Sequence, residues 1–354
     1  MQIVTVEVER AVIPAAMPPF KWRRGTPGSD PEVIGGILRI GTDAGVEGIA
    51  TTRRGLILED LVNRRLRAEL VGADPFEREW IWQRVWELDR VEELPIYLLG
   101  IVDIALWDLA GKALKVPTYQ LLGAYRREIP AYASTTTFAS IEEYLEVADQ
   151  CLELGFKAIK LHAWGDARED ARLAEALRAH VGGSIDLMYD GSAGFDLPDA
   201  IYLGRALSGA GFRWYEEPMR EFSVTAYKWL SDRVQIPLLV AETSDGAHMN
   251  TADFIASGCA TYVRTSAALR GGFTGAMRIA HTADSFRLRA EVHGDGLPSV
   301  HLCMAIPNTT YYESMVNSNP VVREALVDAQ GLVHAPSEPG VGFPEQGIGI
   351  KAAA

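Results

Sequence analysis

The chain is poor in cysteine and contains neither a basic cluster nor a long apolar run. Its three cysteines lie far apart and have no CxxC spacing, which argues against a disulfide framework. No apolar stretch approaches the roughly 18 residues of a membrane span. Residues 1–10 lack the basic and apolar regions of a signal peptide. We therefore expect a cytoplasmic protein that does not associate with a membrane.

The balance of charge is acidic. Acidic residues outnumber basic residues by 47 to 34, which gives a net charge of −13 at pH 7. This balance argues against nucleic acid as a partner. An anionic substrate would need local cations or a metal ion to overcome the overall repulsion. Apolar residues make up 48% of the 354 residues, which is enough for a large core.

Two kinds of pattern divide the chain. Residues 1–60 read as rich in β-strand, with a hairpin over 32–51 that turns at 42–45, and residues 58–125 carry apolar side chains at helical spacing. From about residue 129, strands alternate with helices until eight strands are complete, which predicts a closed parallel barrel. We expect an α/β protein with an α+β capping domain over 1–125, a TIM-like (β/α)8 barrel over 126–330, and a tail over 331–354 that packs back on the cap.

Three carboxylates recur at the ends of successive predicted strands. Asp190, Glu216 and Glu242 follow one another at intervals of 26 residues, about the length of one βα unit. Their side chains would converge at one mouth of the barrel and repel one another unless a cation lay between them. Oxygen ligands suit a hard divalent ion, so we expect one Mg²⁺, with Mn²⁺ as the alternative. The competing interpretation is that these acidic residues are merely solvated.

Candidate acid–base groups flank this predicted metal site. Lys160 and His162 are two residues apart on one strand, so both face the interior. His293 ends the seventh strand, across the barrel from the second. Two such groups facing each other across a metal suit proton transfer at one carbon, because a metal-bound carboxylate acidifies its α-proton. Taken alone, His293 is equally well explained as a buried structural histidine. The alternative for Lys160 is a surface lysine, but it lies inside AIKLHA at 158–163, which should be buried.

Several motifs together resemble the enolase superfamily and, within it, the mandelate racemase and muconate lactonizing enzyme group. They are DIALWDLAGKALKVPTYQLLG at 103–123, GFKAIKLH at 155–162, WYEEP at 214–218 and RGGFTG at 270–275. His293 lies 22 residues after Gly271 and Glu313 lies 20 after His293, as in that group. The resemblance covers essentially the whole chain. It implies an active site between cap and barrel, three carboxylate ligands to Mg²⁺, a Glu313 carboxyl that hydrogen-bonds the substrate carboxylate, and a homo-oligomer.

The chain departs from the group at three positions. His162 stands where the group has the second Lys of a Lys-x-Lys pair, and Ser192 stands where Asn is common. Ser266 stands where an Asp usually orients the catalytic His. The missing Asp weakens His293 as a base and favours it as the acid for a leaving hydroxide, while His162 stays a credible base or acid.

These features predict Mg²⁺-dependent abstraction of the proton α to a carboxylate, through an enediolate. We expect a lyase that dehydrates a small sugar acid (an aldonate or aldarate) to a 2-keto-3-deoxy acid. Lys160 or His162 would be the base and His293 the acid. The alternatives are a racemase or epimerase of a 2-substituted carboxylic acid, and a non-catalytic metal-binding barrel.

Two further predictions concern single contacts. The cap loop carries Lys21, Trp22, Arg23 and Arg24, which would bind substrate carboxylate or hydroxyl groups, or else form an ordinary solvated loop. Strand alternation puts Arg264 on the face of Ser266, and Glu291 on the face of His293. We therefore expect Arg264 and Glu291 to form an ion pair inside the barrel, unless one of them leans out to solvent.

Overall fold

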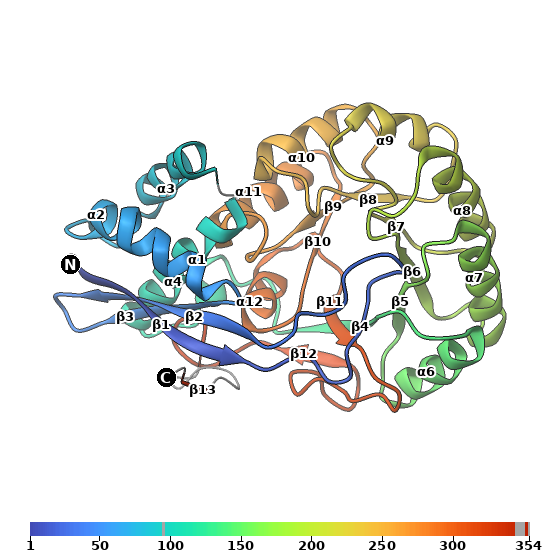
Figure 1. Ribbon diagram of the computed structural model, residues 1–354, viewed down its shortest axis with the longest axis horizontal. Helices are drawn as coiled ribbons and strands as arrows, with labels where there is room; N and C mark the ends of the chain where they lie inside the picture. The colour runs from blue at the N-terminus through green and yellow to red at the C-terminus, as the bar shows by residue number, and fades with distance from the viewer. Residues whose placement is uncertain (94–95, 344–350, 353–354) are drawn as a thin grey trace.

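The computed structural model describes residues 1–93, 96–343 and 351–352, and shows a cap beside a curled parallel sheet (Figure 1). In the cap, β1 (Ile3–Ile13), β2 (Val33–Thr42) and β3 (Glu47–Thr52) form an antiparallel sheet. The predicted β2–β3 hairpin is confirmed, and Gly45 N donates to Thr42 O in its turn.

Helices complete the cap. They are α1 (Gly55–Leu61), a π-helical turn (Val62–Leu66), α2 (Arg67–Leu70), α3 (Arg78–Glu92), α4 (Ile96–Leu114) and α5 (Thr118–Leu121). Helix α4 packs on β2 and β3. A Cβ atom at Gly48 would lie 2.1 Å from the Ala105 carbonyl oxygen. Because Gly48 has no side chain, helix α4 can approach β3 this closely.

Eight parallel strands form the second layer and confirm the predicted TIM-like barrel. They are β4 (Glu128–Thr135), β5 (Ala158–His162), β6 (Asp186–Asp190), β7 (Tyr215–Glu216), β8 (Leu238–Val240), β9 (Tyr262–Thr265), β10 (Arg289–Val292) and β11 (Tyr312–Val316). They are ordered β10-β9-β8-β7-β6-β5-β4-β11. The two ends approach each other, because Ala290 N on β10 donates to Asn308 O shortly before β11.

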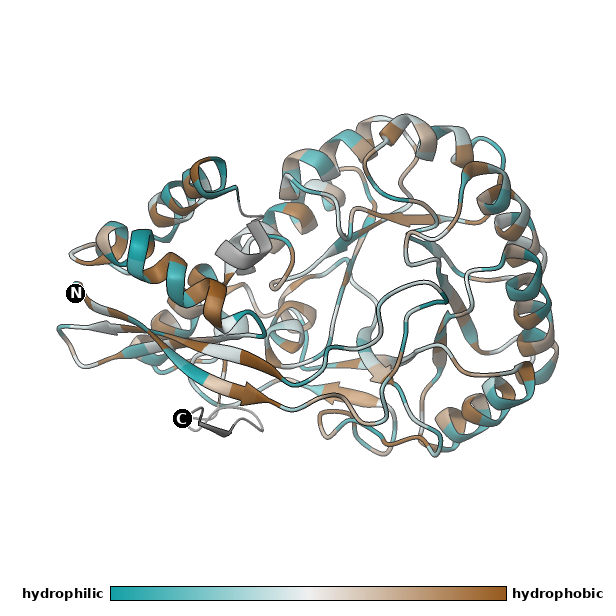
Figure 2. Cartoon of the chain, viewed as in Figure 1, coloured by the Kyte–Doolittle hydropathy of each residue, from teal (hydrophilic) through white to brown (hydrophobic). Residues whose placement is uncertain are grey.

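Helices follow the strands and surround the sheet. They are α6 (Ile141–Glu153), α7 (Ala167–Val181), α8 (Leu197–Gly209), α9 (Val224–Ser231), α10 (Ala247–Ala256), α11 (Gly272–Ser285) and α12 (Leu297–Ala305). The side-chain oxygens of Ser140, Asp166, Asp196 and Ser223 accept from first-turn N–H groups, which fixes where four of these helices begin. Hydrophilic residues alternate with hydrophobic ones along the helices, as expected for helices with one covered face (Figure 2).

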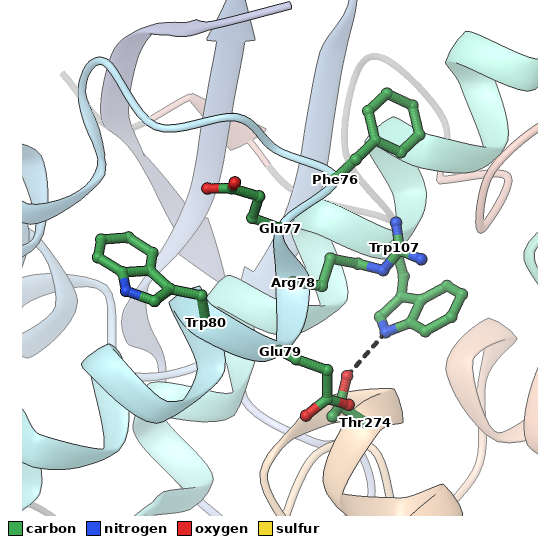
Figure 3. Close-up of a pocket in the computed structure, with 7 residues that line it drawn as sticks. All are labelled: Phe76, Glu77, Arg78, Glu79, Trp80, Trp107 and Thr274. Atoms are coloured by element: carbon green, nitrogen blue, oxygen red, sulfur yellow. Dashed lines mark hydrogen bonds between the residues drawn. The ribbon is translucent and has the colours of Figure 1, made fainter.

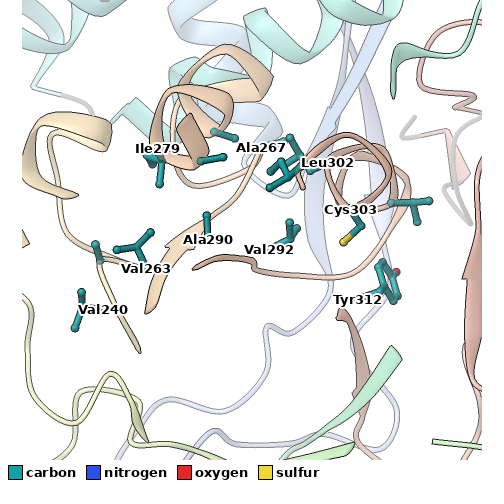
Figure 4. Packing of buried hydrophobic residues seen from close by; sticks show 14 of the residues in the cluster. Val240, Val263, Ala267, Ile279, Ala290, Val292, Leu302, Cys303 and Tyr312 are labelled. Atoms are coloured by element: carbon teal, nitrogen blue, oxygen red, sulfur yellow. The ribbon is translucent and has the colours of Figure 1, made fainter. Parts of the chain in front are cut away.

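The apolar core has two parts. Between strands and outer helices, Val263 and Val292 are buried together with Ile279 of α11 and Leu302 of α12 (Figure 4). Inside the barrel lies a smaller cluster, which consists of Tyr132, Ala158, Met188, Trp214 and Leu239. Several of its members come two residues before the predicted site residues, so they share the inward face with them. The smaller cluster therefore forms the floor beneath the mouth of the barrel.

The C-terminal segment contacts both layers. Strand β12 (Leu332–His334) pairs with β4, and β13 (Lys351–Ala352) pairs with β1 of the cap. His301 on α12 accepts from Tyr119 N at 2.9 Å, and its other ring nitrogen lies 3.1 Å from Val341 O. Of the predicted tail, residues 344–350 and 353–354 lie outside the described residues. Among the helices of the described residues, we find none that combines the length and apolar character needed to cross a membrane.

Candidate active site

The predicted site residues meet at the C-terminal ends of the barrel strands. Lys160 and His162 belong to β5, Asp190 to β6, Glu216 to β7 and Glu313 to β11, while Glu242 and His293 follow β8 and β10. The parallel register brings His162 opposite Asp190, and Asp190 opposite Glu216. All of these residues except His293 are buried. The residues predicted at the ends of the barrel strands therefore form one connected group of side chains.

The Lys160 ammonium lies between three carboxylates. Its Nζ is 2.7 Å from Glu313 Oε1, 3.1 Å from Glu216 Oε2 and 3.2 Å from Asp190 Oδ2. Burial alone would lower the pKa of Lys160, but the Glu216 and Glu313 carboxylates hold it well above its ordinary value. Lys160 is therefore a fixed cation in this structure.

His162 contacts oxygen acceptors through both ring nitrogens. Nε2 lies 3.0 Å from Asp190 Oδ2, and Nδ1 lies 2.6 Å from the Thr135 carbonyl oxygen. These two contacts fix the orientation of the imidazole ring beside Asp190. Burial opposes ionisation of Asp190, but His162 and Lys160 outweigh it and hold the pKa of Asp190 below its ordinary value.

Arg264 binds a different partner from the one that the sequence predicts. Its Nε and Nη2 form a fork on the two oxygens of Glu216, with Nη2 2.8 Å from Oε2. Glu291 instead accepts from the hydroxyls of Thr309 and Thr310 and from Thr310 N. Among the described residues Arg264 and Glu291 form no salt bridge, so the predicted pair is wrong. The planar guanidinium reaches across the barrel to a carboxylate that offers both oxygens, whereas Glu291 is already satisfied locally.

His293 stands beside two carboxylates. Nδ1 is 3.3 Å from Glu242 Oε2 and 3.4 Å from Glu313 Oε2. Glu313 is itself fixed, because Oε1 accepts from Ser134 Oγ and Oε2 accepts from Gly294 N, both at 2.8 Å. Burial alone would lower the pKa of His293, but Glu242 and Glu313 raise it to about 9. His293 therefore carries a proton at neutral pH.

The donor set fits a hard divalent cation. Ligand atoms of Glu216, Glu242 and His293 lie within 4.8 Å of one another, although His293 would have to lose its proton to serve as a ligand. Glu242 Oε2 is buried and makes no hydrogen bond within the described part of the chain, although the cations His293 and Arg264 lie 3.3 and 3.6 Å from it, so it could serve as an oxygen ligand. Asp190 lies outside this close triad, because it is drawn to Lys160 and His162.

The cap loop reaches the site through Trp22. The ring centroids of Trp22 and His162 are 4.6 Å apart, and Phe20 packs edge-on against Trp22. The carbonyl of Lys21 accepts from Thr137 N, which ties the loop to the end of β4. Trp22 is thus the residue of the predicted loop cluster that contacts a candidate catalytic group.

The neighbouring arginines hold the loop in place. Arg23 Nε donates to the Ser192 carbonyl at 3.1 Å. Arg24 forms an ion pair of 2.7 Å with Glu169 and lies 5.4 Å from the centroid of the Trp164 ring. These guanidinium groups are engaged with the protein, so their predicted contact with substrate stays a prediction.

Sequence reasoning missed residues that support the site. Ser134 holds Glu313, and Trp214 Nε1 donates to Glu216 Oε2 at 3.2 Å. The buried Glu221 carboxylate accepts from the backbone N–H groups of Ala241, Thr243 and Ser244, which flank Glu242. Ser134 and Trp214 could have been found by strand alternation, since each lies on the inward face of its strand. Glu221 carries no comparable signal, because it lies in a loop.

A separate hollow of about 640 Å³ lies where α3, α4 and α11 meet (Figure 3). The Arg78 guanidinium lies 4.0 Å from the centroid of the Trp107 ring, and Trp107 Nε1 donates to Thr274 Oγ1. The residues that line it include none of the predicted site residues. It is therefore distinct from the candidate active site.

Comparison with known proteins agrees with this geometry. Residues 3–123 match the N-terminal domain of mandelate racemase and muconate lactonizing enzyme, and residues 143–344 match the enolase C-terminal domain-like family. The chain is 29% identical over 323 residues to 3,6-anhydro-alpha-L-galactonate cycloisomerase of Streptomyces coelicolor, which covers 86% of this chain and 87% of that protein.

Solved structures are similar over nearly the full length. D-glucarate dehydratase from Agrobacterium tumefaciens, complexed with magnesium, is 31% identical with a TM-score of 0.87, over 96% of this chain and 95% of that one. A racemase from Streptomyces coelicolor with bound magnesium is 27% identical with a TM-score of 0.83, over 96% of each chain. This chain is thus an enzyme of the enolase superfamily and belongs to its mandelate racemase and muconate lactonizing enzyme group.

Proposed function

We propose that this enzyme removes the α-proton of a sugar acid and eliminates the neighbouring hydroxyl, giving a 2-keto-3-deoxy acid. The observation that carries the proposal is the placement of His162 and His293 at the ends of two separate strands, with the carboxylate cluster beside both. Dehydration needs one group to accept the α-proton and another to protonate the leaving hydroxyl. The similarity to D-glucarate dehydratase supports this reaction.

Asp190, Glu216 and Glu242 would hold Mg²⁺ in this proposal, and Mn²⁺ would suit the same oxygen ligands. The ion, when bound, would supply positive charge next to the substrate carboxylate and so make the α-proton more acidic. Glu313, held by Ser134 and Gly294, would hydrogen-bond a substrate carboxylate oxygen. Lys160 adds a fixed positive charge beside the same pocket.

His162 is the better candidate for the base. Lys160 keeps its proton because two carboxylates stabilise the ammonium, whereas an imidazole such as that of His162 is the commonest general base in proton abstraction. The base form of His162 needs its contact with Asp190 to open. His293 would act as the acid: its proton goes to the hydroxyl on C3, the C3–O bond breaks, and water leaves.

The test is a screen of purified, Mg²⁺-loaded protein against a library of aldonates and aldarates. Formation of a 2-keto acid is followed by the absorbance of its semicarbazone. A product that wild type makes and an Asp190→Asn variant does not make supports the proposal. If no acid in the library gives a 2-keto acid, the dehydration is wrong.

A racemase or epimerase is the second candidate, because a racemase is among the similar structures and histidines approach the site from two strands. Deuterium exchange at C2 in deuterated water separates the two reactions. Exchange without a 2-keto product would favour racemisation or epimerisation. The absence of both product and exchange would leave a non-catalytic metal-binding barrel.

A further inference from the structure

Arg264 is a cation that is completely buried inside the barrel. Its side chain is 0% exposed and forks onto both oxygens of Glu216. It also lies 3.6 Å from Glu242 Oε2 and 3.7 Å from Glu313 Oε2. Further contacts with Tyr132 Oη and the Val292 carbonyl fix its orientation. A side chain whose charge cannot be neutralised by loss of a proton is thus built into the carboxylate cluster.

We propose that Arg264 is an internal counter-ion that takes the place of a divalent cation on Glu216, so that it weakens Mg²⁺ binding while keeping the metal-free site folded. The inference rests on the metal site of the proposed function, but it does not depend on which reaction the enzyme performs.

The hydrogen-bonding capacity of Glu216 is the first argument. Oε2 accepts from Arg264 Nη2, Lys160 Nζ and Trp214 Nε1, at 2.8, 3.1 and 3.2 Å, and Oε1 accepts from Arg264 Nε. A carboxylate offers about four lone-pair sites. Oε2 is therefore fully engaged and Oε1 already accepts from Arg264, so any cation that binds Glu216 must share the carboxylate with Arg264.

The charge of the cluster is the second argument. The carboxylates of Asp190, Glu216, Glu242 and Glu313 converge there and are all buried. Buried carboxylates are strongly unfavourable without cations to offset them. Arg264 contacts Glu216 and lies close to Glu242 and Glu313, so its removal would leave the cluster short of positive charge. A bound Mg²⁺ would restore that charge, and the same Mg²⁺ is repelled by Arg264 in the wild type.

Arg270 offers a matched control. It is a second fully buried arginine, but the hydrogen bonds of its guanidinium go to the carbonyls of Ser244 and Ala247 and to the hydroxyls of Ser244 and Thr251. Its hydrogen-bond partners are uncharged groups, and it contacts none of the four carboxylates directly, although Ser244 lies two residues after Glu242. Loss of Arg270 should therefore destabilise the protein without a specific effect on the metal.

The experiment compares wild type, Arg264→Gln, Arg264→Lys and Arg270→Gln without substrate. Titration calorimetry measures the Kd for Mg²⁺, and thermal unfolding is recorded in EDTA and at saturating Mg²⁺. We expect Arg264→Gln to bind Mg²⁺ at least about tenfold more tightly, since a neighbouring unit charge is lost. Arg264→Lys, which keeps the charge, should stay within about threefold of wild type.

Thermal unfolding distinguishes this role from ordinary structural support. In Arg264→Gln the Tm should fall more in EDTA than with Mg²⁺, because ligand binding compensates the lost charge. A variant that folds only with Mg²⁺ meets the same expectation. In Arg270→Gln both Tm values should fall equally, with the Kd unchanged.

Three results would overturn the proposal. They are Mg²⁺ binding by Arg264→Gln that is unchanged or weaker, an equal loss of Tm in both conditions, and failure of that variant to fold even with Mg²⁺. If wild type itself binds no Mg²⁺, the metal site of the proposed function fails and the counter-ion role fails with it. Wild type that binds Mg²⁺ but dehydrates no acid would overturn only the proposed reaction.

Discussion

His293 Nδ1 lies 3.3 Å from Glu242 Oε2, so this histidine has a carboxylate beside it although Ser266 replaces the expected aspartate. Ser266 Oγ instead accepts from Leu269 N and closes its own turn. Burial alone would lower the pKa of His293, but Glu242 and Glu313 raise it to about 9. The histidine therefore keeps its proton near neutrality, which suits an acid better than a base.

Replacement of His293 by Gln should separate the two halves of the reaction. We expect dehydration to slow by about 10²–10⁴-fold, the usual contribution of one acid–base group. Exchange of the substrate α-proton, followed by proton NMR in deuterated water, should persist because His162 is untouched. His334→Gln, at the exposed last residue of β12, is the control and should change neither rate. Equal loss of exchange and dehydration in His293→Gln would contradict the assignment.

Replacement of Trp22 by Ala should impair substrate binding. The Trp22 ring lies 4.6 Å from the His162 ring, so its removal uncovers the candidate base and opens that side of the pocket. We expect KM to rise about tenfold, equivalent to about 1.4 kcal/mol. Trp80→Ala is the matched control, because Trp80 is 54% exposed elsewhere on the cap. Steady-state kinetics in which the two variants behave alike would show that the loop does not meet the substrate.

Asp103 should make stability fall as pH rises. Burial raises the pKa of Asp103 to about 7, against the hydrogen bonds from Thr274 N and Oγ1. The folded protein therefore binds an extra proton between about pH 4 and 7, and this stabilisation is lost as pH rises through 7. From pH 5 to 8, urea unfolding of wild type should lose on the order of 2–3 kcal/mol relative to Asp103→Asn. Parallel pH profiles for the two proteins would exclude this effect.

His301 should produce the opposite dependence. Its Nδ1 accepts from Tyr119 N, so Nε2 carries the proton and donates to Val341 O. Burial lowers the pKa of His301 to about 4, and the stabilisation is full above pH 6.5 and declines as pH falls toward 4. Between pH 7 and 5 wild type should lose on the order of 2 kcal/mol relative to His301→Gln, which can make both contacts without titrating. Exchange of the Tyr119 amide measures this contact directly, and no acceleration at pH 5 would contradict the prediction.

Strand-end positions could be read from the sequence, but partners across the barrel could not. The spacing of Asp190, Glu216 and Glu242 follows from the length of a βα unit, and the structure brings these residues to one mouth. Alternation along β9 and β10 correctly puts Arg264 in the interior. Alternation does not reveal that the long Arg264 side chain binds Glu216 and not its neighbour Glu291. It determines which face of the sheet a side chain lies on, but not which residue that side chain contacts.

The loop contacts were also beyond prediction. A run of charged and aromatic residues indicates a binding loop, but the backbone path decides which side chain faces inward. Here Trp22 contacts His162, while Arg24 turns to Glu169. Burial of Asp103 and His301 likewise depends on how cap, tail and barrel pack, which no local pattern contains.

The pairing of β13 with β1 bears on the order in which the molecule is assembled during synthesis. Residues 11 and 12 leave the ribosome early, but their partners Ala352 and Lys351 leave after all eight barrel strands. Because segments fold as they emerge, the β1 edge of the cap sheet stays unpaired during synthesis of the barrel. Stalled nascent chains that lack residues 351–352 should therefore be cut in the cap by protease faster than released chains. Equal cleavage rates would mean that the cap becomes protected from protease before β13 pairs with β1.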